Sequence, residues 1–177
     1  WQDWYIAQTT MNSGVPKILK SFTHRFNYNE IESLKDLFTK YNNNVAAVIM
    51  EPTRFDKPHC IGEKFCTKKE CSVACQNNFL HDVKAITKEN NALLIFDEVL
   101  IGFRLHKEGA QKYFGVIPDL TCIGKAMANG MPLSAVVGKE KYMNKFPQIY
   151  YSLTSAGEAL SLAAARFTLE IMDKIDI

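Results

Sequence analysis

The sequence predicts an α/β layered sheet, mostly parallel and flanked by helices. Two short runs, residues 45–50 and 92–96, are almost wholly apolar, and each is followed at once by an acidic residue, Glu51 and Asp97. Continuous apolar runs of this length are typical of parallel strands that are buried on both faces. Apolar residues at helical spacing lie between and around these runs. Strands therefore alternate with helices, which is the pattern of an α/β sheet.

The chain before the first buried run predicts one strand and one helix. Residues 16–22 are short and partly alternating, which indicates a strand. Asn29 has the side chain of a helix N-cap, and apolar residues at helical spacing follow it as far as Tyr41. The polar run 42–44 ends this helix.

The rest of the chain continues the alternation. We expect a helix from about 77 to 90, another over 105–114 and a long one over 159–175. Short strands are expected at 118–123 and 133–137, on either side of a polar turn.

The residues that follow the expected strands are the first candidates for a site. In open parallel sheets, ligands bind beyond the carboxyl ends of the strands. The residues at those ends are Glu51, Asp97, Lys125 and Gly138. An Asp and a Lys at neighbouring strand ends can serve a bound ligand, or they can simply form a salt bridge with each other. Taken alone, Asp97 and Lys125 leave both interpretations open.

Composition and missing motifs argue against several classes of function. The chain has 177 residues and a net charge of +2, which gives no electrostatic case for nucleic acid or an anionic membrane as partner. No apolar run is long enough to span a bilayer. The glycine motifs of dinucleotide-binding and P-loop domains are absent, and so is the G-x-S-x-G nucleophile elbow. A nucleotide-binding domain therefore has little support.

Five cysteines are present, and four of them lie between Cys60 and Cys75. An odd number argues against a disulfide framework. The cluster contains no C-x-x-C pair, the spacing that zinc sites usually use, so no metal site is predicted. We expect residues 53–76 to form a Cys-rich loop or insertion with free thiols.

The two ends of the sequence look cut. The chain begins at Trp1 without a recognisable leader, and it ends at Ile177 inside a helical pattern. We expect an internal piece of a longer protein, with a cytoplasmic location.

Several stretches resemble the class III pyridoxal-phosphate (PLP) aminotransferases. Residues 92–104 (ALLIFDEVLIGFR) resemble the cofactor strand of that family, and residues 118–133 (PDLTCIGKAMANGMPL) resemble the stretch that holds its Schiff-base lysine. The resemblance covers nearly the whole chain except about 53–76. Within the family, these sequence motifs are most similar to those of glutamate-1-semialdehyde 2,1-aminomutase and its relatives. Three further stretches match family segments in the same order: 1–5, 45–52 and 154–161.

The resemblance implies the large domain of a fold-type-I PLP-dependent transferase. Residues 1–177 would be its central part, without the N-terminal phosphate loop and the C-terminal small domain, and inactive alone. The implied cofactor is PLP, and the implied assembly is a homodimer with shared active sites. The Gly-rich segment that follows the Glu-Pro strand in many members is missing, so Glu51 and Arg104 are expected to be structural charges.

The implied activity is PLP-dependent amino-group transfer between a small-molecule amino donor and a keto or aldehyde acceptor. One alternative is intramolecular transfer, as in the aminomutase. An alternative from another class is a catalytically silent α/β binding protein or a truncated product.

The resemblance also assigns four site residues. Lys125 would form the Schiff base and is the expected catalytic residue, while Asp97 would sit against the pyridine nitrogen of the cofactor. Val99 lies two residues beyond Asp97 and faces the same side, so it would pack on the cofactor ring or serve as an ordinary core valine. Thr154 would donate to the phosphate in the neighbouring subunit, or act as a strand-end or cap hydroxyl.

Overall fold

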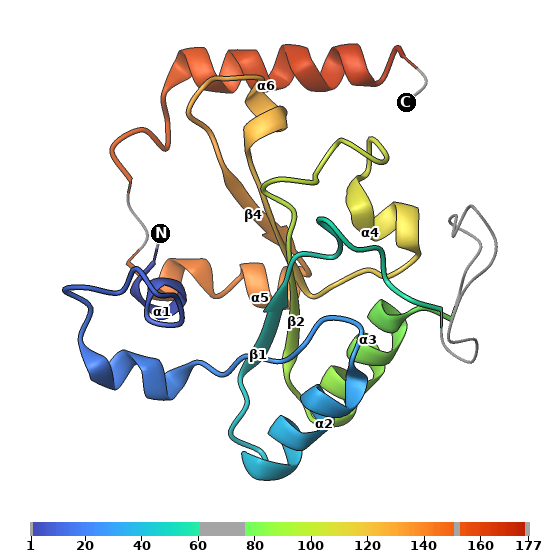
Figure 1. Cartoon of the computed structure of the whole chain (residues 1–177). Helices are drawn as coiled ribbons and strands as arrows, with labels where there is room; N and C mark the ends of the chain where they lie inside the picture. The colour runs from blue at the N-terminus through green and yellow to red at the C-terminus, as the bar shows by residue number, and fades with distance from the viewer. Residues whose placement is uncertain (1, 61–76, 151–152, 176–177) are drawn as a thin grey trace. The chain divides into compact units, whose positions relative to one another are not determined.

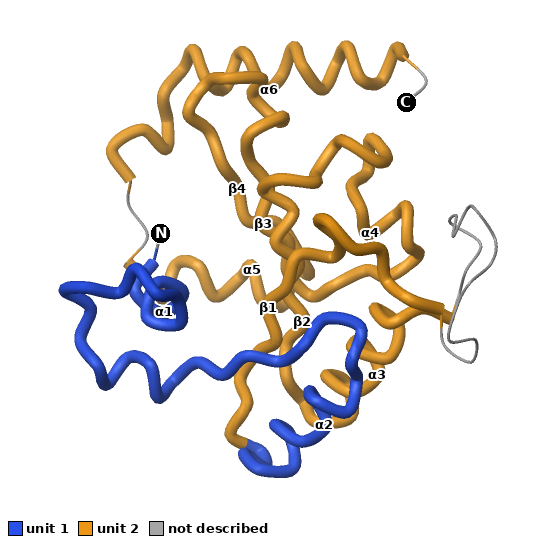
Figure 2. Tube along the Cα trace, in the orientation of Figure 1, with its two compact units in different colours: residues 1–43 blue, residues 44–177 orange. Residues whose placement is uncertain are grey.

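The computed structural model describes residues 2–60, 77–150 and 153–175. The chain divides into two compact units, residues 1–43 and 44–177, which Figure 2 shows in different colours. No helix in these described ranges has the length and apolar character needed to cross a membrane.

The first unit begins with α1 (Asp3–Ile6), followed by the 3-10 helix η1 (Lys17–Phe22). The strand expected over 16–22 is therefore wrong. The side chain of Gln8 explains the difference, because its Nε2 donates to the carbonyl oxygens of Lys20, at 3.1 Å, and Thr23, at 2.6 Å. These bonds tie the stretch to the end of α1 instead of to a sheet.

The first unit ends with α2 (Ile31–Lys40), the helix predicted at about 29–41. Asn29 is not its N-cap. Asn29 takes a left-handed φ of 64°, a conformation that Asn tolerates better than most residues, and Glu30 precedes the helix without a side-chain capping bond. The buried side chains of α2 are Leu34 and Phe38, one turn apart.

The second unit contains a sheet of four strands in the order β1-β2-β3-β4 (Figure 1). Its strands β1 and β2 pair in parallel, and so do β2 and β3, whereas β4 runs antiparallel to β3. The predicted mostly parallel sheet is confirmed. The bounds of the strands are Ala47–Met50, Leu93–Asp97, Leu120–Ile123 and Ala135–Gly138.

The antiparallel direction of β4 changes one prediction about the site. Gly138 pairs with Leu120 at the start of β3, so it lies at the opposite edge of the sheet from Asp97. The expectation that Gly138 joins the ligand-binding strand ends is therefore wrong. The link between β3 and β4 contains a single 3-10 turn, η2 (Lys125–Ala128), and is too short for the helical crossover that a parallel partner needs.

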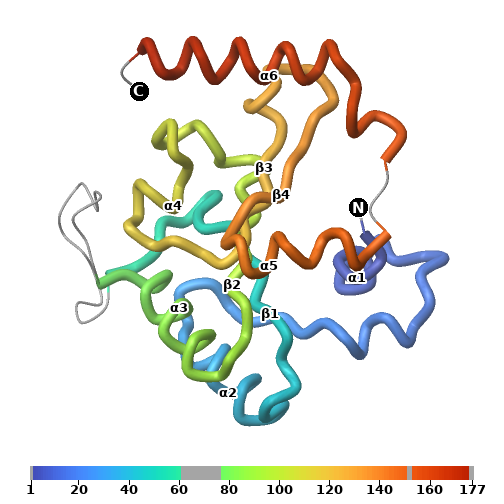
Figure 3. Tube along the Cα trace, turned by 180° about the vertical axis from the view of Figure 1, so that it is seen from behind, coloured from blue at the N-terminus to red at the C-terminus, as the bar shows by residue number. Residues whose placement is uncertain are grey.

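Helices of the second unit pack on individual strands and turns. The buried side of α3 (Phe79–Glu89) lies against β2, and Asn78 caps this helix by accepting from Leu80 N at 3.0 Å. Seen from behind in Figure 3, α5 (Glu140–Met143) lies beside β4, and the short η3 (Phe146–Gln148) follows it.

The longest helix of the second unit, α6 (Ala159–Met172), lies over η2 (Figure 1). Its Ala165 is buried with Met127 and Ala128 of η2. This contact holds the turn that begins at Lys125. On the rest of α6, large apolar side chains are between 40% and 63% exposed, namely Leu160, Leu162, Phe167, Leu169 and Ile171.

The helix expected over 105–114 begins later, as α4 (Gly109–Phe114). Glu98 sets this start, because its carboxylate accepts from the backbone N–H of Ala110 at 2.6 Å and of Gln111 at 3.1 Å. Gly109 has a φ of +83°, and a Cβ on it would meet the Glu98 carboxylate at 2.6 Å. Only glycine fits there without strain.

Candidate active site at the carboxyl ends of the strands

Three charged residues follow the parallel strands at one edge of the sheet. Glu51 comes directly after β1, Asp97 ends β2, and Lys125 lies just beyond β3. Met50 pairs with Phe96, so Glu51 and Asp97 stand next to each other at the same level. We call Glu51, Asp97 and Lys125 the strand-end cluster. Because the charges of Asp97 and Lys125 both act on the pKa of Glu51, the three groups share one electrostatic environment.

Asp97 is half-buried and fixed by its own turn. Its Oδ1 accepts from the backbone N–H of Val99 at 3.0 Å, the local bond that Asp makes at the start of many turns. The charge of Asp97 also reaches its register partner on β3. Burial and, to a smaller degree, Asp97 raise the pKa of the Cys122 thiol.

The neighbour of Asp97 has a structural task. Successive strand residues point to opposite sides, so Glu98 points away from the cluster and into the core, where it is fully buried. Burial raises the pKa of Glu98, and the two backbone bonds from α4 only partly oppose this effect. The two adjacent acidic residues therefore have different positions and roles. Asp97 faces the strand-end cluster, whereas Glu98 binds the first turn of α4.

Lys125 is exposed and sits in a constrained backbone position. Its φ of 44° is left-handed, a conformation that costs a non-glycine residue on the order of 1–3 kcal/mol. The bond from Met127 N to Gly124 O, at 3.0 Å, closes the turn, and the packing of Met127 on α6 holds it. The fold therefore imposes a defined starting direction on the Lys125 side chain.

The side chain of Val99 approaches the same turn from the segment that follows β2. A Cβ placed on Gly124 would lie 3.6 Å from Cγ1 of Val99, and 3.5 Å from Cβ of Ser134. The Val99 side chain therefore lies close to Gly124, the residue immediately before Lys125. The structure brings together three of the four predicted site residues: Asp97 at the end of β2, Val99 in the turn after β2, and Lys125 in the turn after β3.

The salt bridge considered for Asp97 and Lys125 is not formed. Neither residue takes part in an ion pair within the part of the chain that the structure describes. Asp97 and Lys125 therefore both belong to the strand-end cluster without a direct ion pair between them.

Glu51, a strand-end residue that was expected to be a structural charge, has only part of its carboxyl group satisfied. Its Oε1 lies 3.5 Å from Nη1 of Arg54, a long and half-exposed contact. Its Oε2 is buried and has no hydrogen-bond partner among the described residues. Burial raises the pKa of Glu51, and Asp97 adds to this rise, while Arg54 and Lys125 oppose it. Glu51 lies beside Asp97 because β1 and β2 pair in the register that puts Met50 opposite Phe96.

Arg104, interpreted with Glu51 as a structural charge, has a local contact. Its Nε donates to the carbonyl oxygen of Leu100 at 2.6 Å. This bond stays within the turn after β2.

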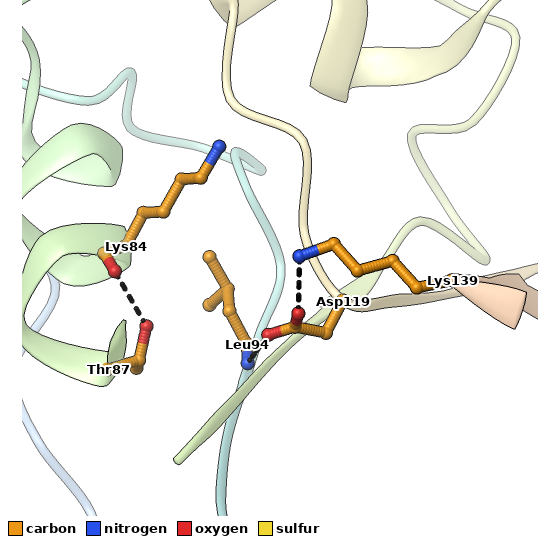
Figure 4. Close-up of polar contacts among 5 residues, drawn as sticks. All are labelled: Lys84, Thr87, Leu94, Asp119 and Lys139. Carbon is orange, nitrogen blue, oxygen red and sulfur yellow. Dashed lines mark hydrogen bonds and ion pairs between the residues drawn. The ribbon is translucent and has the colours of Figure 1, made fainter. Parts of the chain in front are cut away.

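The opposite edge of the sheet shows what a structural charge looks like (Figure 4). Asp119 accepts from Leu94 N at 2.9 Å through Oδ2 and from Lys139 Nζ at 2.6 Å through Oδ1. Burial alone would raise the pKa of Asp119, but these two bonds outweigh it and the pKa is lowered.

Thr154 lies apart from the other predicted site residues. It is exposed, in a turn ahead of α6, and no described contact joins it to Asp97, Val99 or Lys125. Its neighbours in the chain, Leu153 and Ser155, line a cavity of about 370 Å³. The other lining residues come from the start of β4, α5 and the adjoining turns: Pro132, Leu133, Ser134, Ala135, Val136, Met143, Phe146 and Ala156.

Curated relatives match this chain over most of its length. A glutamate-1-semialdehyde 2,1-aminomutase 2 of an Exiguobacterium species is 40% identical over 159 residues, which are 88% of this chain and 34% of that protein. A glutamate-1-semialdehyde 2,1-aminomutase of Thermosipho africanus is 38% identical over 168 residues, 93% of this chain and 37% of that protein. The chain thus spans about a third of the length of these relatives.

A solved structure supports the fold. The FumI protein of Sphingopyxis sp. MTA144, in its PLP internal aldimine form, is similar with a TM-score of 0.80 and 28% identity, over 98% of this chain and 39% of that one. The expected fold class is confirmed. The family model "Aminotransferase class-III" matches residues 6–177, and the chain belongs to this family.

Proposed function

We propose that this chain carries the central part of a PLP-dependent enzyme that transfers amino groups. The observation that supports it best is the strand-end cluster, in which Asp97 ends β2 and Lys125 lies just beyond the neighbouring β3, without an ion pair between them. A charge that only stabilises a fold is normally paired when it is partly buried, as Asp97 is. The relatives named above are aminomutases, and the similar solved structure holds PLP.

The residues present fit the cofactor. One oxygen of Asp97 is taken by Val99 N, so the other is available to a ring N–H. The side chain of Val99 lies against Gly124, next to Lys125, and offers an apolar surface to a ring. The buried Glu51 Oε2 leaves hydrogen-bonding capacity unused in the same environment. When bound, PLP supplies a ring that draws in the electrons of the substrate carbon next to nitrogen.

Each residue then has a task that follows from its own chemistry. Lys125 Nζ would hold the cofactor and, when free, would carry a proton to and from the substrate carbon. The Asp97 carboxyl group would hold the proton of the ring nitrogen, and Val99 would offer its apolar surface to the ring. One charge contact of this kind at about 4 Å is worth on the order of 4 kcal/mol in a partly buried site.

Thr154 belongs to a further proposal, a homodimer with shared sites. We infer that its hydroxyl donates to the cofactor phosphate of a neighbouring subunit, which agrees with its exposed position away from the strand-end cluster. The exposed apolar side chains of α6, exemplified by Phe167 at 62%, favour burial in a larger assembly. Light scattering of the complete protein tests this inference, because a monomer that retains PLP would contradict it.

A second activity has specific support. The curated relatives are named aminomutases, which favours amino transfer within one molecule over transfer between a small-molecule donor and a keto or aldehyde acceptor. Product analysis with one labelled substrate distinguishes the two. The cytoplasmic location and the assignment of residues 1–177 to the centre of a large domain stay predictions.

The test of the cofactor site is chemical labelling of the complete protein that contains this sequence. We expect PLP followed by borohydride to leave a stable pyridoxyl group on Lys125, found by peptide mass spectrometry. Lys125→Ala should abolish the label. Lys139→Ala should keep it, since Lys139 binds Asp119 at the other edge of the sheet. A folded protein without label would favour the catalytically silent α/β binding protein.

A further inference from the structure

We propose that Glu51 is a positioning residue that acts through Asp97. In the cofactor-loaded protein, the Oε2–H of Glu51 donates a hydrogen bond to the Asp97 carboxylate, while in the free protein that group lowers stability. This inference rests on the proposed function, because it concerns the residue that would bind the cofactor nitrogen.

Glu51 lies beside Asp97 at the ends of two paired strands. Ile49 pairs with Ile95 and Met50 with Phe96, so the next pair along the two strands is Glu51 beside Asp97. Side chains at paired positions of parallel strands point to the same face. The two carboxyl groups are therefore neighbours on one face, at the edge where Lys125 also lies.

Hydrogen-bonding capacity carries the second step. Oε2 of Glu51 is buried and lacks a partner among the described residues, whereas Oδ1 of Asp97 already accepts from Val99 N. A buried oxygen without a bond lowers stability by about 1–3 kcal/mol. The second oxygen of Asp97 has two lone pairs, so it can accept from the cofactor ring N–H and from one further donor. A donor on Glu51 and an acceptor on Asp97 would satisfy both groups.

The proton on Glu51 carries the third step. Two neighbouring carboxyl groups in a partly buried site share a proton readily, since both cannot be ionised at low cost. The groups that act on Glu51 are Asp97 and Lys125 of the cluster and Arg54 of its own loop. Burial raises the pKa of Glu51 and the neighbouring Asp97 adds to this rise, so Glu51 holds a proton more readily than an exposed glutamate does.

A purely structural role predicts a different behaviour. A residue that holds the fold loses stability when it is replaced, and any loss of binding follows from that loss. If Glu51 serves the site instead, replacing it with an apolar residue of similar length should leave the free protein equally stable or more stable. The contact with Arg54 changes this expectation little, because it is long and half-exposed.

The experiment compares Glu51→Met with Glu51→Gln in the complete protein. Met removes the donor, whereas Gln keeps a neutral donor of nearly the same shape. We measure the unfolding temperature of the cofactor-free protein and the dissociation constant of PLP by absorbance. Glu32→Met and Glu32→Gln are the matched controls, because Glu32 pairs with Lys35 on the surface of α2.

We expect Glu51→Met to unfold at an equal or higher temperature and to bind PLP about tenfold more weakly, the effect of one lost hydrogen bond. Glu51→Gln should recover most of this affinity, and both Glu32 variants should bind PLP normally. Equal losses in the Gln and Met variants, unchanged affinity in Met, or a lower unfolding temperature in Met would each overturn the proposal. Absence of label on Lys125 in the unsubstituted protein would instead refute the proposed function.

Discussion

The two edges of the sheet carry acidic residues in opposite circumstances. At the edge where β3 begins, Asp119 binds a backbone N–H and an ammonium group, and its pKa is lowered (Figure 4). At the edge where β1 ends, Glu51 has a buried oxygen without a partner among the described residues, and its pKa is raised. The same sheet thus holds a satisfied carboxylate at one end and an unsatisfied carboxyl at the other.

The difference between Asp119 and Glu51 distinguishes a charge that stabilises the fold from a group that is expected to serve a ligand. A paired and hydrogen-bonded charge, such as Asp119, stabilises the native state and would be retained for the fold alone. A cluster that leaves its hydrogen-bonding capacity unused destabilises the free protein, and such arrangements persist where a ligand completes them. The comparison therefore predicts that substitutions at the two edges will affect different measurements.

The largest effect is expected for Asp97→Asn. Under the proposed function, in which Asp97 holds the ring nitrogen, loss of its charge should lower the rate of amino transfer about a thousandfold, which corresponds to about 4 kcal/mol. The unfolding temperature should change little, because Asn keeps the oxygen that accepts from Val99 N. Steady-state rates and thermal unfolding of the complete protein check this. A variant that loses stability but not rate would contradict the difference between the edges.

A substitution of Asp119, at the opposite edge of the sheet, should lower stability and leave PLP binding unchanged. Asp119→Ala removes two bonds and leaves the buried Leu94 N–H without this acceptor, so the free energy of unfolding should fall by about 2–3 kcal/mol. PLP binding by the folded fraction should not change. Urea unfolding and PLP titration measure the two quantities. Weaker PLP binding at full stability would show that this edge also serves the site.

The pH dependence of Asp119 sharpens the comparison. Because its native pKa is lowered, its charge stabilises the protein above the unfolded-state pKa of about 3.9, and this contribution is lost as pH falls through the native pKa. Asp119→Asn should therefore be about 1 kcal/mol less stable than the unsubstituted protein at pH 7. The difference should shrink in acid. A difference that is constant down to low pH would contradict the role of the charge.

Elements that depend on local sequence patterns were predicted correctly, whereas elements that depend on contacts between distant residues were not. The runs 45–50 and 92–96 became β1 and β2 because a continuous apolar segment is a local property. The stretch 16–22 contains a 3-10 helix, and Gln8, distant in sequence, binds the carbonyl oxygen of Lys20 within it and that of Thr23 just after it. Local patterns could not show that bond.

The same distinction between local patterns and distant contacts applies to the residues of the candidate site. Asp97 and Lys125 were predictable because they directly follow apolar strands and lie in recognisable stretches. The importance of Glu51 depends on the register of β1 on β2, and the place of Gly138 depends on the direction of β4. Register and direction are set by pairing between distant segments, so a single sequence does not reveal them.

The smallest expected effect belongs to Lys139→Met. Its ammonium group binds Asp119 at 2.6 Å, but the Lys139 side chain is 48% exposed, so solvent weakens the attraction and the loss should be below about 1 kcal/mol. Asp119 would keep its bond from Leu94 N, and this explains why the lysine matters less than its partner. A double-mutant cycle with Asp119→Asn measures the coupling by urea unfolding. A coupling as large as the whole Asp119→Ala effect would mean that the ion pair, and not the backbone bond, stabilises this edge.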